Sequence, residues 1–193
     1  MDLSKYILTV DDIVEEECLD RIIMWLEGNP NLFQRAKTVN TFTMLEKEEK
    51  KIRDTSNINL SPHHQSYTAR HWANYLGAKF TQALSVYSKQ YNFASFPGLQ
   101  LIDMQVLKYK EQGHYTFHVD HCNEIPRTMS MILLLNDDYQ GGELCFADPN
   151  GSNENKVKNK KGRMILWPSN FLYPHKVSPV TKGTRYSIVC WAL

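Results

Sequence analysis

The chain has 193 residues, of which 42% are hydrophobic, which is enough to fill one core and predicts one domain over residues 1–193. Its 22 basic and 21 acidic residues give a formal net charge of +1, which argues against nucleic acid or a membrane surface as a partner. No apolar run is long enough to cross a bilayer, and no basic segment followed by an apolar one opens the sequence. Four cysteines without CxxC spacing indicate reduced thiols. We therefore expect a soluble, cytoplasmic monomer.

The first half of the chain is predicted to contain two helices. The first lies within residues 11–31, with Asp12 as its N-cap, and ends near Gly28. The second begins where Ser61 precedes Pro62. Apolar residues at helical spacing indicate the buried faces, and aromatic residues among them are expected in the core. These faces are Val14, Cys18, Ile22 and Leu26 in the first helix and Trp72, Leu76, Phe80, Leu84 and Tyr87 in the second.

Two polar segments are predicted to lie outside the regular core. Residues 36–61, between the helices, are rich in charged side chains and would form either a solvated hairpin or loop, or a mobile flap over a site. Residues 150–161 are rich in Asn and Lys and are expected to form a solvated loop.

From about residue 100 the pattern changes to short strands separated by turn residues. Many short strands at this spacing favour a sandwich or jelly roll over alternating strands and helices. The predicted fold is therefore α+β, with N-terminal helices supporting a double-stranded β-helix. The helical support and flap would occupy about 1–95 and the β-core about 96–193. The expected strands lie within 98–110, 128–137, 142–148, 162–169 and 184–193.

The segment HYTFHVDH, residues 114–121, places several potential metal ligands close together. Residues i and i+2 of a strand point to the same side, so His118 and Asp120 can bind one ion. His175 lies in a second strand-like segment. Two histidines and one carboxylate form the facial triad of non-haem Fe(II) oxygenases, although a catalytic zinc can use similar ligands.

Arg185, ten residues after His175, helps to choose between these metals. Its guanidinium offers a bidentate fork for a carboxylate, and a buried guanidinium needs such a partner. Ser187 faces the same side and would add a hydroxyl donor. The pattern predicts an anionic ligand that reaches from the metal to Arg185, and 2-oxoglutarate has that shape.

Three segments together resemble the 2-oxoglutarate/Fe(II) dioxygenase superfamily, and specifically its prolyl 4-hydroxylase-like branch. They are YKEQGHYTFHVDH, NDDYQGGELCF and HKVSPVTKGTRYSIVCW, and the likeness covers residues 101–193. More loosely, IRDTSNINL at residues 52–60 resembles the flap of this family. The resemblance implies that His118, Asp120 and His175 are the catalytic Fe(II) ligands and that Arg185 pairs with the distal carboxylate of 2-oxoglutarate.

The same resemblance assigns further residues to the cosubstrate and to the substrate. Tyr109 would donate a hydrogen bond to the carboxylate that Arg185 binds, and Tyr115 would line the pocket mouth. Arg127 and Trp191 match positions near the substrate in prolyl hydroxylases, where they would flank a proline ring. The sequence departs from some relatives at Leu134, where they carry another tyrosine.

The function that the resemblance implies is hydroxylation of a prolyl residue in a protein or peptide. The cofactor is Fe(II), the cosubstrates are 2-oxoglutarate and O2, ascorbate is an expected additional requirement, and succinate and CO2 are released. Two alternatives are a hydroxylase of a small molecule, such as a free amino acid, and a catalytically silent β-helix that binds a ligand.

Overall fold

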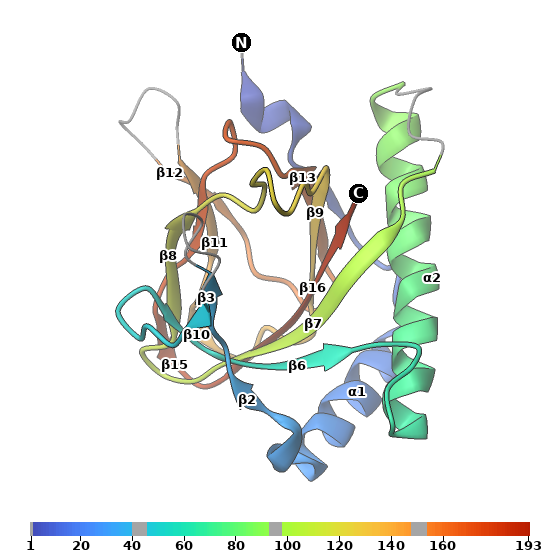
Figure 1. Cartoon of the computed structure of the whole chain (residues 1–193), viewed down its shortest axis with the longest axis vertical. Coiled ribbons are helices and arrows are strands. Elements are labelled where there is room, and N and C mark those ends of the chain that lie inside the picture. Colours follow the sequence, from blue (N-terminus) through green and yellow to red (C-terminus); the bar gives the residue numbers. More distant parts are fainter. Residues whose placement is uncertain (1, 40–45, 93–97, 148–153) are drawn as a thin grey trace.

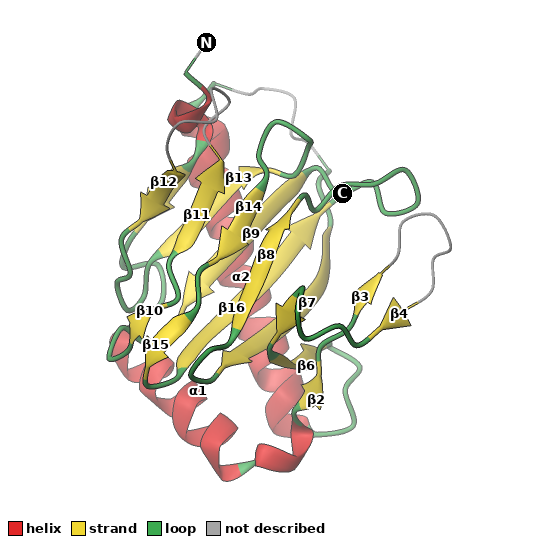
Figure 2. Cartoon of the chain, turned by 90° about the vertical axis from the view of Figure 1, so that its left-hand side faces the viewer, coloured by secondary structure: helices red, strands yellow, loops and turns green. Residues whose placement is uncertain are grey.

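The fold is built mainly from β-sheets, with two helices packed on one side (Figure 1). The computed structural model describes residues 2–39, 46–92, 98–147 and 154–193. A seven-stranded sheet lies between the helices and a five-stranded sheet, so the molecule has three layers (Figure 2). The helices are α1 (Glu16–Gly28) and α2 (Tyr67–Gln90), and 3-10 turns span Leu3–Tyr6 and Pro30–Leu32.

Every strand pair in both sheets is antiparallel. The seven-stranded sheet has the order β1-β13-β9-β16-β7-β6-β2, and the five-stranded sheet has the order β12-β11-β14-β8-β5. The larger sheet comprises β1 (Leu8–Val10), β13 (Met164–Pro168), β9 (Met129–Leu134), β16 (Arg185–Ala192), β7 (Leu101–Tyr109), β6 (Ser56–Leu60) and β2 (Gln34–Arg35). The smaller comprises β12 (Glu154–Val157), β11 (Leu144–Ala147), β14 (His175–Val177), β8 (His114–His118) and β5 (Arg53–Asp54). Two further pairs are β10 (Gln140–Gly141) with β15 (Val180–Lys182), and β3 (Thr38–Val39) with β4 (Glu46–Lys47).

All five strands predicted after residue 98 are present, and in the four that belong to the larger sheet the side chains alternate between two cores. In β9, for example, Met131 and Leu133 pack towards the helices, whereas Ile132 and Leu134 pack between the two sheets. This alternation explains why the strand reads as a continuous apolar run, because both of its faces are buried. In β16 the same period of two directs the side chain of every second residue from Arg185 towards the smaller sheet.

Both predicted helix starts are wrong by several residues. Asp12 has a positive φ of 62° and lies ahead of α1, whose N-cap is Glu15 without a side-chain cap bond. The second helix starts after Ser66, whose hydroxyl accepts a hydrogen bond from the backbone N–H of Ala69 at 3.4 Å, and Ser61 lies in the preceding turn. Two serines, Ser61 and Ser66, precede α2, and spacing alone did not identify the one that caps it, whereas no side chain caps α1.

The apolar faces of the helices were predicted more accurately than their ends. Ile22 and Leu26 of α1 are fully buried, but Leu19 completes this face, since Val14 precedes the helix and Cys18 is only half-buried. The face of α2 that packs on the larger sheet contains Trp72, Leu76, Phe80 and Tyr87, with Leu84 partly buried beside them.

Residues 53–60 are not a loop or flap, as had been predicted, but two strands. β5 pairs with β8 at the edge of the smaller sheet, and β6 pairs with β7 in the larger sheet. Residues 40–45 of the expected flap, and 150–153 of the expected loop 150–161, lie outside the described residues, whereas 154–157 form β12. Among the described helices, none has the length and apolar character needed to span a membrane.

Candidate active site

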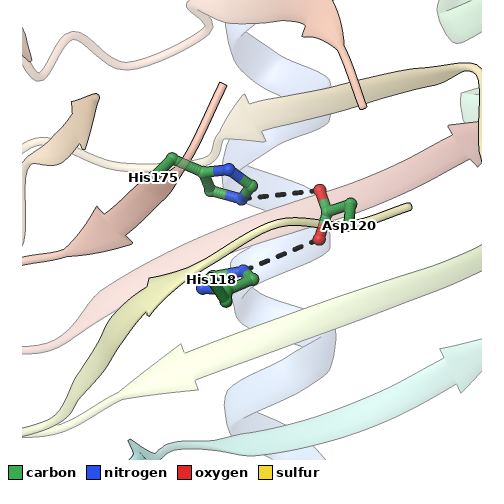
Figure 3. Close-up of side chains that lie close together, drawn as sticks. All are labelled: His118, Asp120 and His175. Carbon is green, nitrogen blue, oxygen red and sulfur yellow. Dashed lines mark ion pairs between the residues drawn. The ribbon is translucent and has the colours of Figure 1, made fainter. Parts of the chain in front are cut away.

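The three predicted metal ligands lie together at the ends of two neighbouring strands (Figure 3). His118 is the last residue of β8 and His175 the first of β14, and the two residues are directly opposite in the strand register. Asp120 follows β8, and its carboxylate oxygens lie 3.6 Å from Nε2 of His118 and 3.4 Å from Nε2 of His175. One ligand atom from each residue lies within 4.8 Å of the others, which is close enough to share one ion.

Backbone carbonyls fix the orientation of both imidazole rings. Nδ1 of His118 lies 2.9 Å from the carbonyl oxygen of Thr116, and Nδ1 of His175 lies 3.0 Å from that of Tyr173. A carbonyl oxygen can only accept, so Nδ1 carries the hydrogen in each ring. Each Nε2 is therefore left with a lone pair that points to Asp120, which is the arrangement that a metal ligand requires.

Burial and mutual proximity also set the charges of these groups. Burial, followed by the nearby His175, lowers the pKa of His118 to about 3, so its ring is neutral at pH 7. Burial would raise the pKa of Asp120, but the two histidines and a hydroxyl donor outweigh it, and the pKa falls to about 2. The neutral imidazole of His118, the ionised carboxylate of Asp120 and the Nε2 lone pair of His175 form a donor set that fits a divalent cation.

Two serines that the sequence had not indicated lie next to Asp120. The hydroxyl of Ser130 donates to Oδ2 of Asp120 at 2.6 Å. Ser169 places its own hydroxyl oxygen 2.7 Å from that of Ser130, and both serines are buried. Asp120 is thus held by a residue from β9 and, through it, by a residue that follows β13.

Arg185 is fully buried, and most of its hydrogen-bonding capacity is unused in the described part of the chain. Nη1 donates to the hydroxyl oxygen of Ser187 at 2.6 Å, so Ser187 accepts from Arg185 and keeps its own hydrogen to donate. Nε and Nη2 have no partner among the described residues, and neither has the hydroxyl of Tyr109, whose ring centre lies 5.2 Å from the guanidinium carbon. A buried cation with two open donors is costly unless an anion pairs with it, so this corner fits a carboxylate.

A glycine provides the space that Arg185 occupies. Gly142 has a φ of +63°, and a Cβ atom on it would lie 3.0 Å from Cδ of Arg185 and 3.2 Å from the ring of Tyr139. The hydroxyl of Tyr139 is also buried without a partner in the described residues. Tyr139 was not predicted from the sequence, and it places a buried aromatic hydroxyl near Arg185, whereas Leu134 offers none.

Tyr115 lines the cavity that contains the three converging ligands. Its ring stacks on His118, with ring centres 3.6 Å apart and planes inclined by 18°. Arg53, which the sequence had not indicated, lies over the ring of Tyr115, with its guanidinium carbon 4.8 Å from the ring centre. Arg53 also donates to the carbonyl oxygen of Lys37 at 3.0 Å, which ties this stack to the segment before β3.

Arg127 and Trp191 also line the cavity, but they contact each other. The guanidinium carbon of Arg127 lies 3.7 Å from the ring centre of Trp191, and a weak ion pair of 3.5 Å joins Arg127 to Asp103. One face of the indole is therefore covered by Arg127 and is not open to a proline ring.

The cavity that contains the metal ligands has a volume of about 880 Å³. Its lining includes Tyr109 and apolar residues from the space between the sheets, but not Arg185, which is fully buried. In the other direction the cavity extends along β6 and β7 to β2 and the β3–β4 hairpin. Four amide side chains line this outer part: Gln34, Asn57, Asn59 and Gln105.

Comparison with known proteins agrees with this geometry. Residues 104–193 match the model of the 2OG-Fe(II) oxygenase superfamily. A PKHD-type hydroxylase of Alteromonas mediterranea is 43% identical over 94 residues, which are 44% of this chain and 40% of that protein. A PKHD-type hydroxylase of Xylella fastidiosa is 35% identical over 130 residues, 60% of this chain and 54% of that protein. The chain thus spans about half or less of the length of these relatives.

Solved structures share the fold over almost the whole chain. A prolyl hydroxylase from Trichoplax adhaerens, in complex with a peptide fragment of the hypoxia inducible factor oxygen degradation domain, superposes with a TM-score of 0.76 at 18% identity. That match covers 97% of this chain and 83% of the other. A Pseudomonas putida prolyl-4-hydroxylase gives a TM-score of 0.71 at 19% identity, covering 98% and 94%. The predicted resemblance to the 2-oxoglutarate/Fe(II) dioxygenase superfamily is confirmed over residues 104–193, and the two prolyl hydroxylase structures share the fold of this chain.

Proposed function

We propose that this chain is an Fe(II)- and 2-oxoglutarate-dependent oxygenase that hydroxylates a prolyl residue of a polypeptide. The observation that carries the proposal is the pairing of a convergent His118, Asp120 and His175 triad with a buried Arg185 whose donors lack an anion. Iron held by the triad would supply O2 activation coupled to conversion of 2-oxoglutarate to succinate and CO2. We also infer that the two facing sheets form a double-stranded β-helix and that residues 1–193 act as one domain.

The protein's own residues would bind, orient and exclude water. His118 and His175 present fixed Nε2 lone pairs, and Asp120 supplies the negative charge. Arg185 and the hydroxyl of Tyr109 would bind the distal carboxylate of 2-oxoglutarate, which would complete their hydrogen bonds. The apolar side chains packed between the sheets would keep water from this corner, and electrostatic attraction is stronger in such surroundings.

The outer part of the cavity favours a polypeptide over a small molecule. Asn57, Asn59 and Gln105 present amide groups there, and each amide both donates and accepts hydrogen bonds, as a peptide backbone does. Asn57 and Gln105 contact each other only weakly, at 3.4 Å, so they can exchange this contact for one to a bound chain. The peptide in the Trichoplax adhaerens complex supports the same substrate class. Trp191 lines the same cavity and would contact the target proline there.

The substrate is expected to be identified by oxygen addition to a protein. The chain would be incubated with Fe(II), 2-oxoglutarate, ascorbate and a lysate of its own host, and hydroxyproline mapped by peptide mass spectrometry. A hydroxyproline at one discrete site that requires the wild-type chain, and is missing with His175→Ala, would support the proposal. Turnover of free amino acids without any modified protein would instead establish the small-molecule alternative.

A second prediction concerns the amide side chains of the outer cavity and can be tested once a peptide substrate is known. The double change Asn57→Leu and Gln105→Leu is expected to raise KM for the peptide about tenfold, roughly 1.4 kcal/mol for two neutral hydrogen bonds. Slow 2-oxoglutarate turnover without peptide should be unchanged, because neither residue contacts the metal ligands. Gln82→Leu on the exposed side of α2 serves as the control. An unchanged KM in the double variant would show that the peptide does not use this part of the cavity.

A further inference from the structure

We propose that Ser169 and Ser130 form a hydroxyl chain that fixes the rotation of the Asp120 carboxylate and thereby sets the affinity of the metal site. The hydroxyl chain is defined by Oγ of Ser169, Oγ of Ser130 and Oδ2 of Asp120, linked at 2.7 and 2.6 Å. This proposal rests on one part of the proposed function, namely that the triad binds a divalent metal. Both serines are positioning residues, because they would act on the metal through Asp120.

The hydroxyl chain joins the two sheets. Both histidines come from adjacent strands of the smaller sheet, whereas Asp120 lies beyond the end of β8 and is not part of a strand. Ser130 lies in β9, a strand of the larger sheet that is buried along its whole length. Its hydroxyl therefore connects the one ligand outside regular structure to a rigid strand of the opposite sheet.

The number of hydrogens fixes the direction of this hydroxyl chain. A metal-binding carboxylate is ionised and can only accept, so the single hydroxyl hydrogen of Ser130 is donated to Asp120. Oγ of Ser130 is then left with lone pairs alone, so the contact with Ser169 is satisfied only if Ser169 donates. A hydroxyl that accepts one hydrogen bond donates a stronger one, so Ser169 strengthens the bond from Ser130 to Asp120.

Backbone hydrogen bonds hold Ser169 against the loop that carries Asp120. The N–H of His121 donates to the carbonyl oxygen of Ser169 at 3.1 Å, and the N–H of Ser169 donates to that of Thr128 at 3.0 Å. Both ends of the segment 121–128 are thereby hydrogen-bonded to Ser169, which directly follows β13. The hydroxyl position of Ser169 is consequently fixed relative to Asp120 itself.

The orientation of the Asp120 carboxylate determines which of its oxygens is free to bind a metal ion. Oδ2 already accepts from Ser130, and Oδ1 faces Nε2 of His118. Without the hydroxyl, the carboxylate could rotate about its Cβ–Cγ bond, and its ordering would have to occur when the metal binds. Loss of such an outer partner typically weakens metal binding about 10- to 100-fold.

Cobalt(II) binding, followed by its visible absorption spectrum, tests the hydroxyl chain without any turnover. Ser130→Ala is expected to weaken Co(II) binding about 10- to 100-fold and to change the absorption bands that report ligand geometry. Ser130→Thr, which keeps the hydroxyl, should restore both. Ser169→Ala should weaken binding less, and it should add little in the Ser130→Ala background, because its effect passes through Ser130.

Thr55→Val is the matched control, since Thr55 is buried and its hydroxyl donates to the carbonyl oxygen of Lys108 at 2.9 Å, away from the triad. Thermal unfolding of each variant would be measured without metal. Wild-type Co(II) affinity in Ser130→Ala, or an equal loss in Thr55→Val, would overturn the proposal while leaving the oxygenase function intact. A Ser130-specific loss in a chain without 2-oxoglutarate turnover would support the hydroxyl chain and overturn the oxygenase function. No Co(II) binding by the wild type would overturn both.

Discussion

Replacing any one of His118, Asp120 and His175 by alanine is expected to abolish succinate formation from 2-oxoglutarate. Each residue would supply one of the three ligands that converge in the described part of the chain, and the two rings are already fixed by carbonyl contacts, so we expect no neighbouring group to take a lost position. The measurement is succinate release with Fe(II) in excess, together with direct titration of Co(II) or Fe(II). Metal affinity and turnover should be lost together.

His121→Ala is the matched control for this series. His121 follows the motif directly, but its Nδ1 contacts the carbonyl oxygen of Arg127 at 2.9 Å, and the residue is not one of the three converging ligands. This variant should retain turnover and metal binding. The apo variants should also stay folded, because the cores on both faces of the larger sheet are built from apolar side chains. Wild-type succinate production by any triad variant would show that the triad assignment is wrong.

Arg185→Ala is expected to raise the requirement for 2-oxoglutarate strongly while leaving metal binding nearly unchanged. Losing one partner of a desolvated charge pair costs roughly 2–5 kcal/mol, or about 30- to 4,000-fold in affinity. The apparent KM for 2-oxoglutarate and a separate Co(II) titration would be measured on the same preparation.

Arg185→Lys provides the comparison that separates charge from geometry. Lysine keeps the positive charge but loses the two-pronged fork and the contact with Ser187, so it should fall between the wild type and Arg185→Ala. Equal losses of metal and 2-oxoglutarate binding in Arg185→Ala would mean that the buried guanidinium supports the fold instead of the cosubstrate.

The strands of the second half could be predicted because their burial leaves a local pattern. Continuous apolar runs such as β9 mark strands that are covered on both faces. The strands at residues 53–60 lack such a run, because Asn57 and Asn59 line a polar cavity and alternate with the buried Ile58 and Leu60 over only five residues. Their place in the sheet depends on pairing with β7, about 50 residues away in sequence.

The residues of the candidate site could be predicted from the sequence only where their spacing along the chain is characteristic of the chemistry. His118 and Asp120 are two residues apart, and Arg185 stands at the start of a clear strand. The contact of Ser130 with Asp120 depends on how closely two sheets approach, which no spacing encodes. One signal was nevertheless present: a single serine within the apolar run MSMILLL must find a hydrogen-bond partner if that run is buried.

The division of the site between two sheets has a consequence for substrate chemistry. The histidines belong to the smaller sheet, whereas Arg185 and Tyr109 are paired neighbours in the larger one. Packed sheets stand about 10 Å apart, and here the spacing is set by the side chains between them. If a keto diacid bridges the metal and the guanidinium, the distance between the two sheets selects the chain length of that diacid. A diacid one methylene shorter or longer would be rejected by the thickness of the core, which no single side chain controls.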